Sequence, residues 1–338
     1  MYREFYKLRR DPFDITPDPS FLFLSKRHRE ALASMYHGIR RRRGFVVLTG
    51  EVGTGKTLLI TCLLQLLKDS EVRSAFVFNS RLSAMEFLQY VAAELGLSVS
   101  GKSKAEVLHE LSRLVITRHE QKLTTLIIID EAHYLPPDSL EEVRLLSNLE
   151  TAQDKLVQIL LVGQPELSNR LDSFEFRHLK QRVALRSNLG PLSLDETRSY
   201  VRRRLLLAGA DRNTDELVPQ DTIVQIHHHA RGIPRLINTI CENAFITAFA
   251  RRLPQVSPDI IDEVAEDLCL GVNGSPRQEG NAGGSELLQA ARTLLEMHDR
   301  LHRPRRVEEL LTDLDLELGD GAPPRILLDI SNEEKLAS

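Results

Sequence analysis

Several features are scarce or missing in this chain of 338 residues, and each absence excludes a class of protein. There is no tryptophan, and aromatic residues make up only 5%, so a stacking platform for single-stranded nucleic acid has little support. Every apolar run is shorter than the roughly 20 residues that cross a bilayer. The N-terminus shows no apolar stretch typical of a secretory signal. These absences predict a cytoplasmic protein, and an apolar content of 42% with 27% charged residues predicts an ordinary hydrophobic core.

Cysteine is also scarce. Cys62, Cys241 and Cys269 lie far apart, each in a segment that predicts a helix with apolar neighbours. This pattern predicts reduced cysteines in the core and neither a disulfide nor a metal site. The run His227–His229 does not change this prediction, because consecutive residues point to different faces of a helix and cannot all bind one ion.

Charge is unevenly distributed along the chain, although the formal net charge is only −4. Residues 1–43 hold eleven Lys or Arg against five Asp or Glu, whereas residues 271–338 hold eight against thirteen. A basic end could meet nucleic acid or an acidic partner, but the overall acidity favours a solvated surface. The run Arg40–Arg43 ends a predicted helix, where positive charge complements the helix dipole.

The most informative stretch is the run Phe45–Thr57, FVVLTGEVGTGKT, in which an apolar strand leads into a glycine loop and then a helix. This order is the context in which G-x-x-x-x-G-K-T predicts a phosphate-binding P-loop. The glycines let the backbone N–H groups approach phosphate oxygens at a helix N-terminus. Lys56 is expected to reach the β- and γ-phosphates, and Thr57 to bind Mg²⁺. The residues expected to hold ATP are Gly50, Glu51, Val52, Gly53, Thr54, Gly55, Lys56, Thr57 and Leu58.

Strands and helices alternate over the first 190 residues, which predicts an α/β fold with a parallel five-stranded sheet covered on both faces. Besides the strand at 45–48, strands are expected at 74–79, 126–131, 157–162 and 182–186. Helices are expected at 25–41, from the P-loop to 68, at 83–95, 103–120 and 138–149, and after residue 165. The ligand of such a sheet binds at the carboxyl ends of its strands.

The rest of the chain predicts helices without strands, at about 194–208, 220–230, 233–251 and 257–269. A glycine-rich linker at 271–284 and one amphipathic helix at 285–301 are expected to follow, in a partly disordered tail. We therefore predict three domains, listed here with their residues: a nucleotide-binding α/β domain at 1–190, a helical lid domain at 191–270, and a linker with an acidic tail at 271–338. Residues 2–24 predict a loop that packs down on the protein.

Asp130 and Glu131 end the most apolar of the predicted strands. A carboxylate there can hold Mg²⁺, and a second one can orient and deprotonate an attacking water molecule. We expect Asp130 to have the first role and Glu131 the second. With His133 the sequence spells Asp-Glu-Ala-His, as in a class of helicases, but other helicase motifs are not evident. His133 is therefore interpreted as a loop residue.

These motifs occur in an order that resembles the AAA+ ATPases, and within them the ExeA-like group of general secretion pathway protein A. The similarity covers about residues 2–270. The segments that carry it are Asp11–Phe13, Thr16–Leu24, His28–Leu32, Gly44–Thr57, Ile129–Ala132, Leu161–Leu167, Leu179–Arg182, Leu192–Thr197 and Gly232–Asn238.

The resemblance implies roles for residues that the P-loop argument does not reach. Gln164 is similar to the polar sensor residue that helps to place the attacking water molecule. Arg182 resembles an arginine finger, and Arg235 the second sensor, which reaches from the lid to the γ-phosphate. Asn79 is similar to the residue that holds the catalytic glutamate idle until a partner binds. The resemblance also implies ATP hydrolysis with Mg²⁺ in a ring or filament of identical copies.

The partner of this ATPase stays open at this point. Relatives with the same core serve secretion, polysaccharide export or DNA transposition, so we expect an ATPase that remodels or regulates a partner complex, of the secretion or exopolysaccharide-export type. The alternative is an ATP-dependent DNA-binding regulator of the transposition or origin-recognition type, for which the basic residues 1–43 are the supporting feature. A scaffold that uses ATP only as a structural ligand is less expected, because Glu131 and Arg182 are present.

Overall fold

The structure, a computed structural model of the chain, describes residues 2–14, 18–68, 71–78, 80–210 and 214–270. By its contacts the chain divides into two compact units, residues 1–279 and 280–338, and every described residue belongs to the first. The predicted linker at 271–284 and the predicted helix at 285–301 lie outside the described residues, and so does Asn79.

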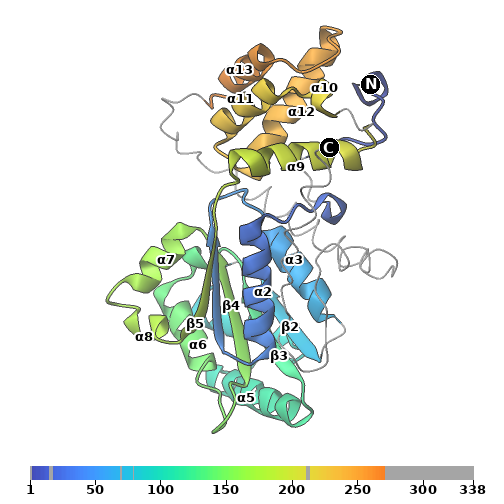
Figure 1. Ribbon diagram of the computed structural model, residues 1–338. Coiled ribbons are helices and arrows are strands. Elements are labelled where there is room, and N and C mark those ends of the chain that lie inside the picture. The colour runs from blue at the N-terminus through green and yellow to red at the C-terminus, as the bar shows by residue number, and fades with distance from the viewer. Residues whose placement is uncertain (1, 15–17, 69–70, 79, 211–213, 271–338) are drawn as a thin grey trace. The chain divides into compact units, whose positions relative to one another are not determined.

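A five-stranded parallel sheet forms the centre of the α/β part, with the strand order β2-β3-β4-β1-β5 (Figure 1). Its strands are β1 (Phe45–Gly50), β2 (Val72–Val77), β3 (Thr124–Ile129), β4 (Val157–Gly163) and β5 (Val183–Leu189). The predicted parallel five-stranded sheet is therefore confirmed. The last strand is longer than expected, since it continues past residue 186.

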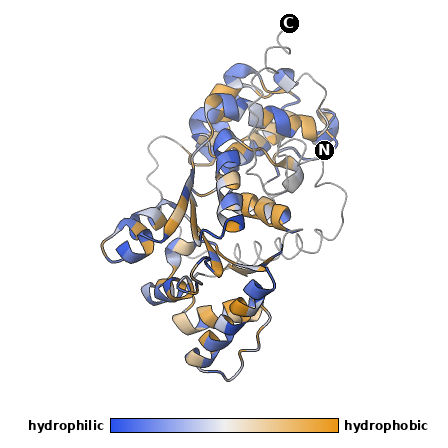
Figure 2. Cartoon of the chain, turned by 60° about the horizontal axis from the view of Figure 1, so that its bottom comes forward, coloured by the Kyte–Doolittle hydropathy of each residue, from blue (hydrophilic) through white to orange (hydrophobic). Residues whose placement is uncertain are grey.

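Helices cover both faces of this sheet, which explains why its central strands are almost entirely apolar. Phe45 and Val47 of β1 belong to a cluster that includes residues of the helices on one face. Val46 faces the other way, toward α2, where a side chain at Gly38 would collide with it. The helices of the α/β part are α2 (Lys26–Arg40), α3 (Lys56–Leu67), α4 (Ala84–Glu94), α5 (Lys104–Glu120), α6 (Pro137–Leu146), α7 (Pro165–Asp172) and α8 (Arg177–Lys180). Figure 2 shows hydrophobic residues along the strands, whereas the helices carry residues of both kinds.

Helices alone follow β5 in the described residues, as the sequence predicts. They are α9 (Leu194–Leu207), α10 (Thr214–Leu217), α11 (Gln220–Ala230), α12 (Pro234–Ala250) and α13 (Pro258–Asp267). Their apolar faces form a second hydrophobic cluster, which is distinct from the one beside the sheet. The domain limits themselves, at residues 190 and 270, stay predictions.

The N-terminal segment belongs to the second cluster, although it comes first in the sequence. It holds one helical turn that the sequence analysis missed, α1 (Tyr2–Phe5), and a short 3₁₀ turn, η1 (Pro19–Phe21). The ring of Tyr6 packs edge-on against Phe245 of α12, with ring centroids 5.1 Å apart. The hydroxyl of Tyr2 donates hydrogen bonds to the carboxylate of Glu242 at 3.0 and 2.9 Å.

The cysteines follow the prediction in two cases and depart from it in the third. Cys62 in α3 and Cys241 in α12 are buried, and burial raises the pKa of the Cys62 thiol to about 12. Cys269 is exposed, because α13 ends at Asp267 and Cys269 has a left-handed backbone conformation with φ of 54°. The prediction of three core cysteines was therefore wrong at Cys269.

Candidate functional site

The P-loop lies between β1 and α3, at the carboxyl edge of the sheet, as predicted. Gly53 and Gly55 adopt φ angles of 80° and 95°, in the left-handed region that favours glycine. The Lys56 ammonium donates hydrogen bonds to the carbonyl oxygens of Gly50 at 2.8 Å and Glu51 at 3.1 Å. Burial lowers the pKa of Lys56, and nearby carboxylates, Glu131 first, partly oppose this effect. The lysine is therefore held inside the loop, close to carboxylates that can keep it charged.

His28 supports the P-loop from α2, and the sequence analysis assigned it no role. Its Nε2 lies 2.9 Å from the carbonyl oxygen of Thr54, and its Nδ1 lies 2.7 Å from the hydroxyl of Ser25. Ser25 also caps α2 by accepting a hydrogen bond from the backbone N–H of His28. A side chain at Gly55 would come within 3.3 Å of the imidazole. The loop thus rests on a buried histidine.

Thr57 and Asp130 lie close enough to share one metal ion. The Thr57 hydroxyl donates to Oδ2 of Asp130 at 3.4 Å, and Oδ1 of Asp130 accepts the backbone N–H of Glu131 at 2.8 Å. Burial raises the pKa of the Asp130 carboxyl from 3.8 to about 6, and the charge of Glu131 adds to the rise. Hard oxygen ligands of this kind suit Mg²⁺, so the residues present fit the predicted ion.

Glu131 has a strained backbone, and one of its carboxylate oxygens accepts no hydrogen bond from the described residues. Its φ of 49° is left-handed, a conformation that costs about 1–3 kcal/mol for a residue other than glycine and is often found at functional sites. Within the described part of the chain, its Oε2 atom is buried without a hydrogen-bond partner. The hydroxyl of Ser80 donates a hydrogen bond to the backbone carbonyl of Glu131 at 2.7 Å, which holds the backbone of Glu131 in place.

Gln164 follows β4 directly and precedes α7. Its backbone N–H donates to Nδ1 of His133 at 3.4 Å, and the same Nδ1 lies 3.4 Å from Oε2 of Glu131. The structure therefore brings together the ends of three strands: Lys56 and Thr57 after β1, Asp130 and Glu131 after β3, and Gln164 after β4. His133, interpreted from the sequence as a loop residue, lies between two of them.

Comparisons with known proteins agree with this geometry. Residues 39–171 match the family described as "AAA domain". General secretion pathway protein A of Aeromonas hydrophila is 40% identical over 252 residues, which cover 74% of this chain and 45% of that protein. The chain thus spans less than half the length of this relative. The DNA transposition protein B of a Mu-like prophage of Haemophilus influenzae is 31% identical over 145 residues, which cover 41% of this chain and 46% of that protein.

Solved structures show the same fold. The Aeropyrum pernix ORC1 protein in complex with DNA superposes with a TM-score of 0.57 at 20% identity, over 78% of this chain and 70% of that one. Drosophila ORC bound to DNA gives a TM-score of 0.58 at 17% identity, over 95% of this chain and 87% of that one. The chain belongs to the AAA+ family of ATPases. Within the AAA+ family it is similar to general secretion pathway protein A.

In this AAA+ chain the residue predicted as second sensor, Arg235, lies at the start of α12. Its backbone N–H donates to the carbonyl oxygen of Gly53 at 3.2 Å. A side chain at Gly53 would come within 2.6 Å of Cβ of Arg235. The first turn of the lid helix therefore touches the P-loop through its backbone, and only a glycine fits at the contact.

Arg182, the predicted arginine finger, lies at the other edge of the sheet. It comes immediately before β5, whereas the P-loop follows β1, and these strands are parallel neighbours. A strand with the 6 residues of β1 spans roughly 20 Å, so Arg182 is about that far from the P-loop of its own chain. Its guanidinium donates to the hydroxyl of Ser147 at 3.2 Å.

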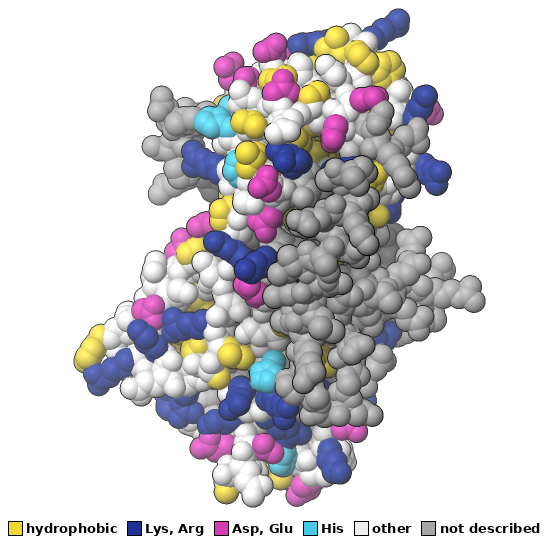
Figure 3. All heavy atoms as spheres, in the orientation of Figure 1, with side chains coloured by type: hydrophobic (Ala, Val, Ile, Leu, Met, Phe, Trp, Pro, Cys, Tyr) yellow, Lys and Arg dark blue, Asp and Glu magenta, His cyan; other side chains and the backbone are white. Residues whose placement is uncertain are grey.

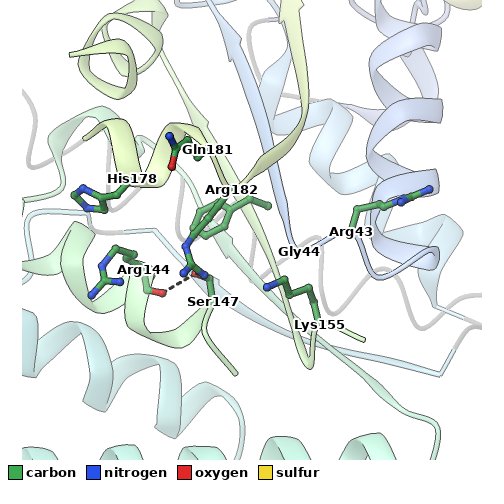
Figure 4. A pocket seen from close by; sticks show the side chains of 9 residues that line it. Arg43, Gly44, Arg144, Ser147, Lys155, His178, Gln181 and Arg182 are labelled. Atoms are coloured by element: carbon green, nitrogen blue, oxygen red, sulfur yellow. Dashed lines mark hydrogen bonds between the residues drawn. The ribbon is translucent and has the colours of Figure 1, made fainter. Parts of the chain in front are cut away.

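The side chain of Arg182 lines a basic pocket of about 440 Å³ (Figure 4). Arg43, Arg144, Lys155 and His178 also line it. Glu141 contacts Arg144 and His178, and Glu150 contacts Lys155. On the face seen in Figure 3, Lys and Arg side chains gather over this region of α6 and the start of β5.

The histidine run in α11 is divided between different neighbours. Nδ1 of His227 lies 2.9 Å from the hydroxyl of Thr197 in α9. Nε2 of His229 lies 2.6 Å from a carboxylate oxygen of Asp262 in α13. The run therefore packs the lid helices together.

Of the residues missed from the sequence alone, Ser80, His28 and His133 contact the site. His133 stood out by its place in the Asp-Glu-Ala-His run, and His28 begins one of the segments that carry the family resemblance. Nothing in the sequence indicated that His28 approaches the P-loop or that Ser80 approaches Glu131.

Proposed function

We propose that this AAA+ protein hydrolyses ATP to ADP and phosphate with Mg²⁺ at the P-loop. The observation that carries the proposal is the convergence of Lys56, Thr57, Asp130 and Glu131 at one edge of the sheet. Each has a chemical type that phosphoryl transfer uses: a cation for the phosphates, two oxygen ligands for a metal ion, and a carboxylate for the attacking water molecule.

The residues act as follows in this proposal. The N–H groups of the loop and the Lys56 ammonium bind the phosphates, and Thr57 and Asp130 hold Mg²⁺, which neutralises charge on the phosphate oxygens. Glu131 has a carboxylate oxygen without a hydrogen-bond partner among the described residues, so its lone pair is available to accept a proton from water. Gln164 orients that water molecule. Leu58, Val52 and Arg235 complete the nucleotide pocket.

We further propose that the active form is a ring or filament in which Arg182 serves the neighbouring copy. Support comes from its position, roughly 20 Å from its own P-loop on the length of the intervening strand. A guanidinium supplied by a second molecule can raise the rate of phosphoryl transfer about 10³-fold or more. Asn79, as the residue that keeps Glu131 idle, also remains part of this proposal.

The work of the ATPase is proposed to be the remodelling or regulation of a protein complex in the cytoplasm, of the secretion or exopolysaccharide-export type. The similarity to general secretion pathway protein A supports this. In the described part of the chain, no helix is both long and apolar enough for a bilayer.

A second candidate is an ATP-dependent DNA-binding regulator. The similarity to a DNA transposition protein favours it, together with the basic pocket beside Arg182. DNA binding of this kind would fall steeply as the salt concentration rises, because it depends on contacts with phosphates. A gel shift with duplex DNA at two salt concentrations separates this candidate from the first.

The ATPase itself is tested with two variants. Lys56→Ala should lose binding of fluorescent ATP, because the loop loses the cation that faces the phosphates; Lys26→Ala, an exposed lysine of α2, is the matched control. Glu131→Gln should bind ATP and stop turnover, with Glu30→Gln as its control. Normal turnover by Glu131→Gln, or normal binding by Lys56→Ala, would refute the proposed site. If the protein binds ATP but does not hydrolyse it at either low or high protein concentration, it would instead be a scaffold that uses ATP as a structural ligand.

A further inference from the structure

His133 lies where two groups of the proposed reaction meet. It belongs to a 3₁₀ turn, η2 (Ala132–Tyr134), directly after the strand that carries Asp130 and Glu131. Only 7% of its side chain is exposed. The guanidinium of Arg170 donates to the His133 carbonyl at 3.1 Å, which fixes the backbone of the turn. The imidazole is therefore buried on a backbone that is held from α7.

One ring nitrogen makes both contacts with the site. Nδ1 accepts the backbone N–H of Gln164 at 3.4 Å and lies 3.4 Å from Oε2 of Glu131. A side chain at Gly163 would come within 3.2 Å of the same nitrogen. The glycine that ends β4 leaves the space in which the imidazole approaches the neighbouring backbone.

The partner of Nδ1 decides which nitrogen carries the proton. A backbone N–H can only donate, so the contact with Gln164 assigns the lone pair to Nδ1 and the proton of the neutral ring to Nε2, which is buried without a hydrogen-bond partner among the described residues. Burial lowers the pKa of His133, an effect that Lys56 and Arg170 strengthen and that Glu131 and Glu166 oppose. The ring is thus neutral at neutral pH, and no hydrogen atom lies between Nδ1 and the Glu131 carboxylate.

We propose that His133 is a positioning residue that fixes Gln164 relative to Glu131 and leaves the Glu131 carboxylate free to take a proton. This inference rests on the proposed ATP hydrolysis. The two groups assigned to the attacking water molecule come from different strands, β4 and β3. His133 links them, because it follows Glu131 by two residues in the chain and accepts the backbone N–H of Gln164. A misplacement of about 1 Å between such groups can cost about 100-fold in rate, so a fixed link matters for turnover.

The test compares two replacements of His133. Phe keeps a ring but has no acceptor, whereas the side-chain oxygen of Asn can take the place of Nδ1. His133→Phe should lower kcat by about 10-fold or more, while ATP affinity and KM stay within about twofold, because the phosphate contacts are untouched. His133→Asn should recover most of the lost rate. A purely structural role would instead change binding and turnover together.

A second measurement needs no variant. Nitrogen NMR of the wild-type imidazole should show Nδ1 without a proton at neutral pH, and the Gln164 amide should exchange slowly with solvent. Wild-type kcat in His133→Phe, or a protonated Nδ1 that donates to Glu131, would overturn the inference. Such a result would leave the ATPase proposal intact if Glu131→Gln is still inactive. If Glu131→Gln hydrolyses ATP normally, the proposed function fails first.

Discussion

The imidazole of His28 lies directly against the P-loop, with Nε2 2.9 Å from the carbonyl oxygen of Thr54. The carbonyl can only accept, so Nε2 carries the proton and Nδ1 accepts the hydroxyl hydrogen of Ser25, 2.7 Å away. The neutral ring therefore satisfies both contacts at once, with the Ser25 hydroxyl as the donor to Nδ1. Protonation would turn Nδ1 into a second donor inside a buried site.

Stability should depend on pH through His28. Burial, the dominant effect, lowers its pKa below the usual 6.5, although the Thr54 carbonyl and Glu196 oppose the shift. As pH falls, the unfolded chain therefore binds a proton at His28 before the folded chain does. The contribution of the neutral His28 to the free energy of unfolding is complete above pH 6.5 and is lost as pH falls toward the folded pKa. His28→Gln, whose amide can donate to Thr54, should flatten this part of the curve.

Urea unfolding at a series of pH values checks the prediction. His109→Gln, which changes an exposed histidine of α5, is the control and should follow the wild-type curve. A wild-type free energy of unfolding that does not change below pH 6.5 would speak against a buried neutral His28.

Gly53 should be needed for the contact between the P-loop and the lid. Gly53→Ala places a Cβ atom 2.6 Å from Cβ of Arg235, at a φ of 80°. Gly96→Ala is the matched control, because Gly96 has a φ of 89° but nothing within 4 Å. Both variants have similar backbone strain, and only the first displaces α12. We expect ATP affinity to fall at least about tenfold, or about 1.4 kcal/mol, in Gly53→Ala alone. Equal affinities in the two variants would show that the contact does not matter for binding.

Arg204 should hold the N-terminal segment in place. The side chain is buried; its Nε donates to the carbonyl oxygen of Pro12 at 2.6 Å, and its Nη1 donates to the hydroxyl of Tyr200 at 2.7 Å. Arg204→Met keeps the apolar stem but leaves the Pro12 carbonyl without its donor, at a cost of about 2–3 kcal/mol in the free energy of unfolding. Denaturant unfolding measures the loss, with the exposed Arg202→Met as control. A loss no larger than that of the control would contradict the assigned role.

The sequence was sufficient for features that depend on local patterns. The apolar run of β3 and the glycine loop after β1 predict both the sheet and the place of Asp130, because parallel strands align their carboxyl ends at one edge. Features that depend on the approach of distant segments were not predictable. No periodicity brings His28 to Thr54, or the N-terminal Tyr6 to Phe245 in a helix far along the chain.

His133 illustrates the same limit at closer range. Its position three residues after Asp130 was visible in the sequence, but the contact with Gln164 depends on the pairing of β3 with β4 and on the absence of a side chain at Gly163. The exposure of Cys269 depends likewise on the residue at which α13 ends.

We propose that ATP is hydrolysed at a site shared by two copies of the chain. Arg182 precedes β5 at the edge opposite the P-loop, in a pocket lined by other cations. If it acts in a neighbour, Arg182→Ala should bind ATP normally and lose turnover by about 10³-fold. Specific activity of the wild type should rise with protein concentration, since the complete site forms only on assembly.

The most direct measurement mixes two inactive variants. Lys56→Ala cannot bind ATP but keeps its Arg182, and Arg182→Ala binds ATP but lacks the guanidinium. Steady-state ATP turnover should reappear in the mixture, because the pocket of Arg182→Ala can receive the arginine of a Lys56→Ala neighbour. Turnover that stays at the level of the separate variants, although size-exclusion chromatography shows that they assemble together, would contradict the shared site.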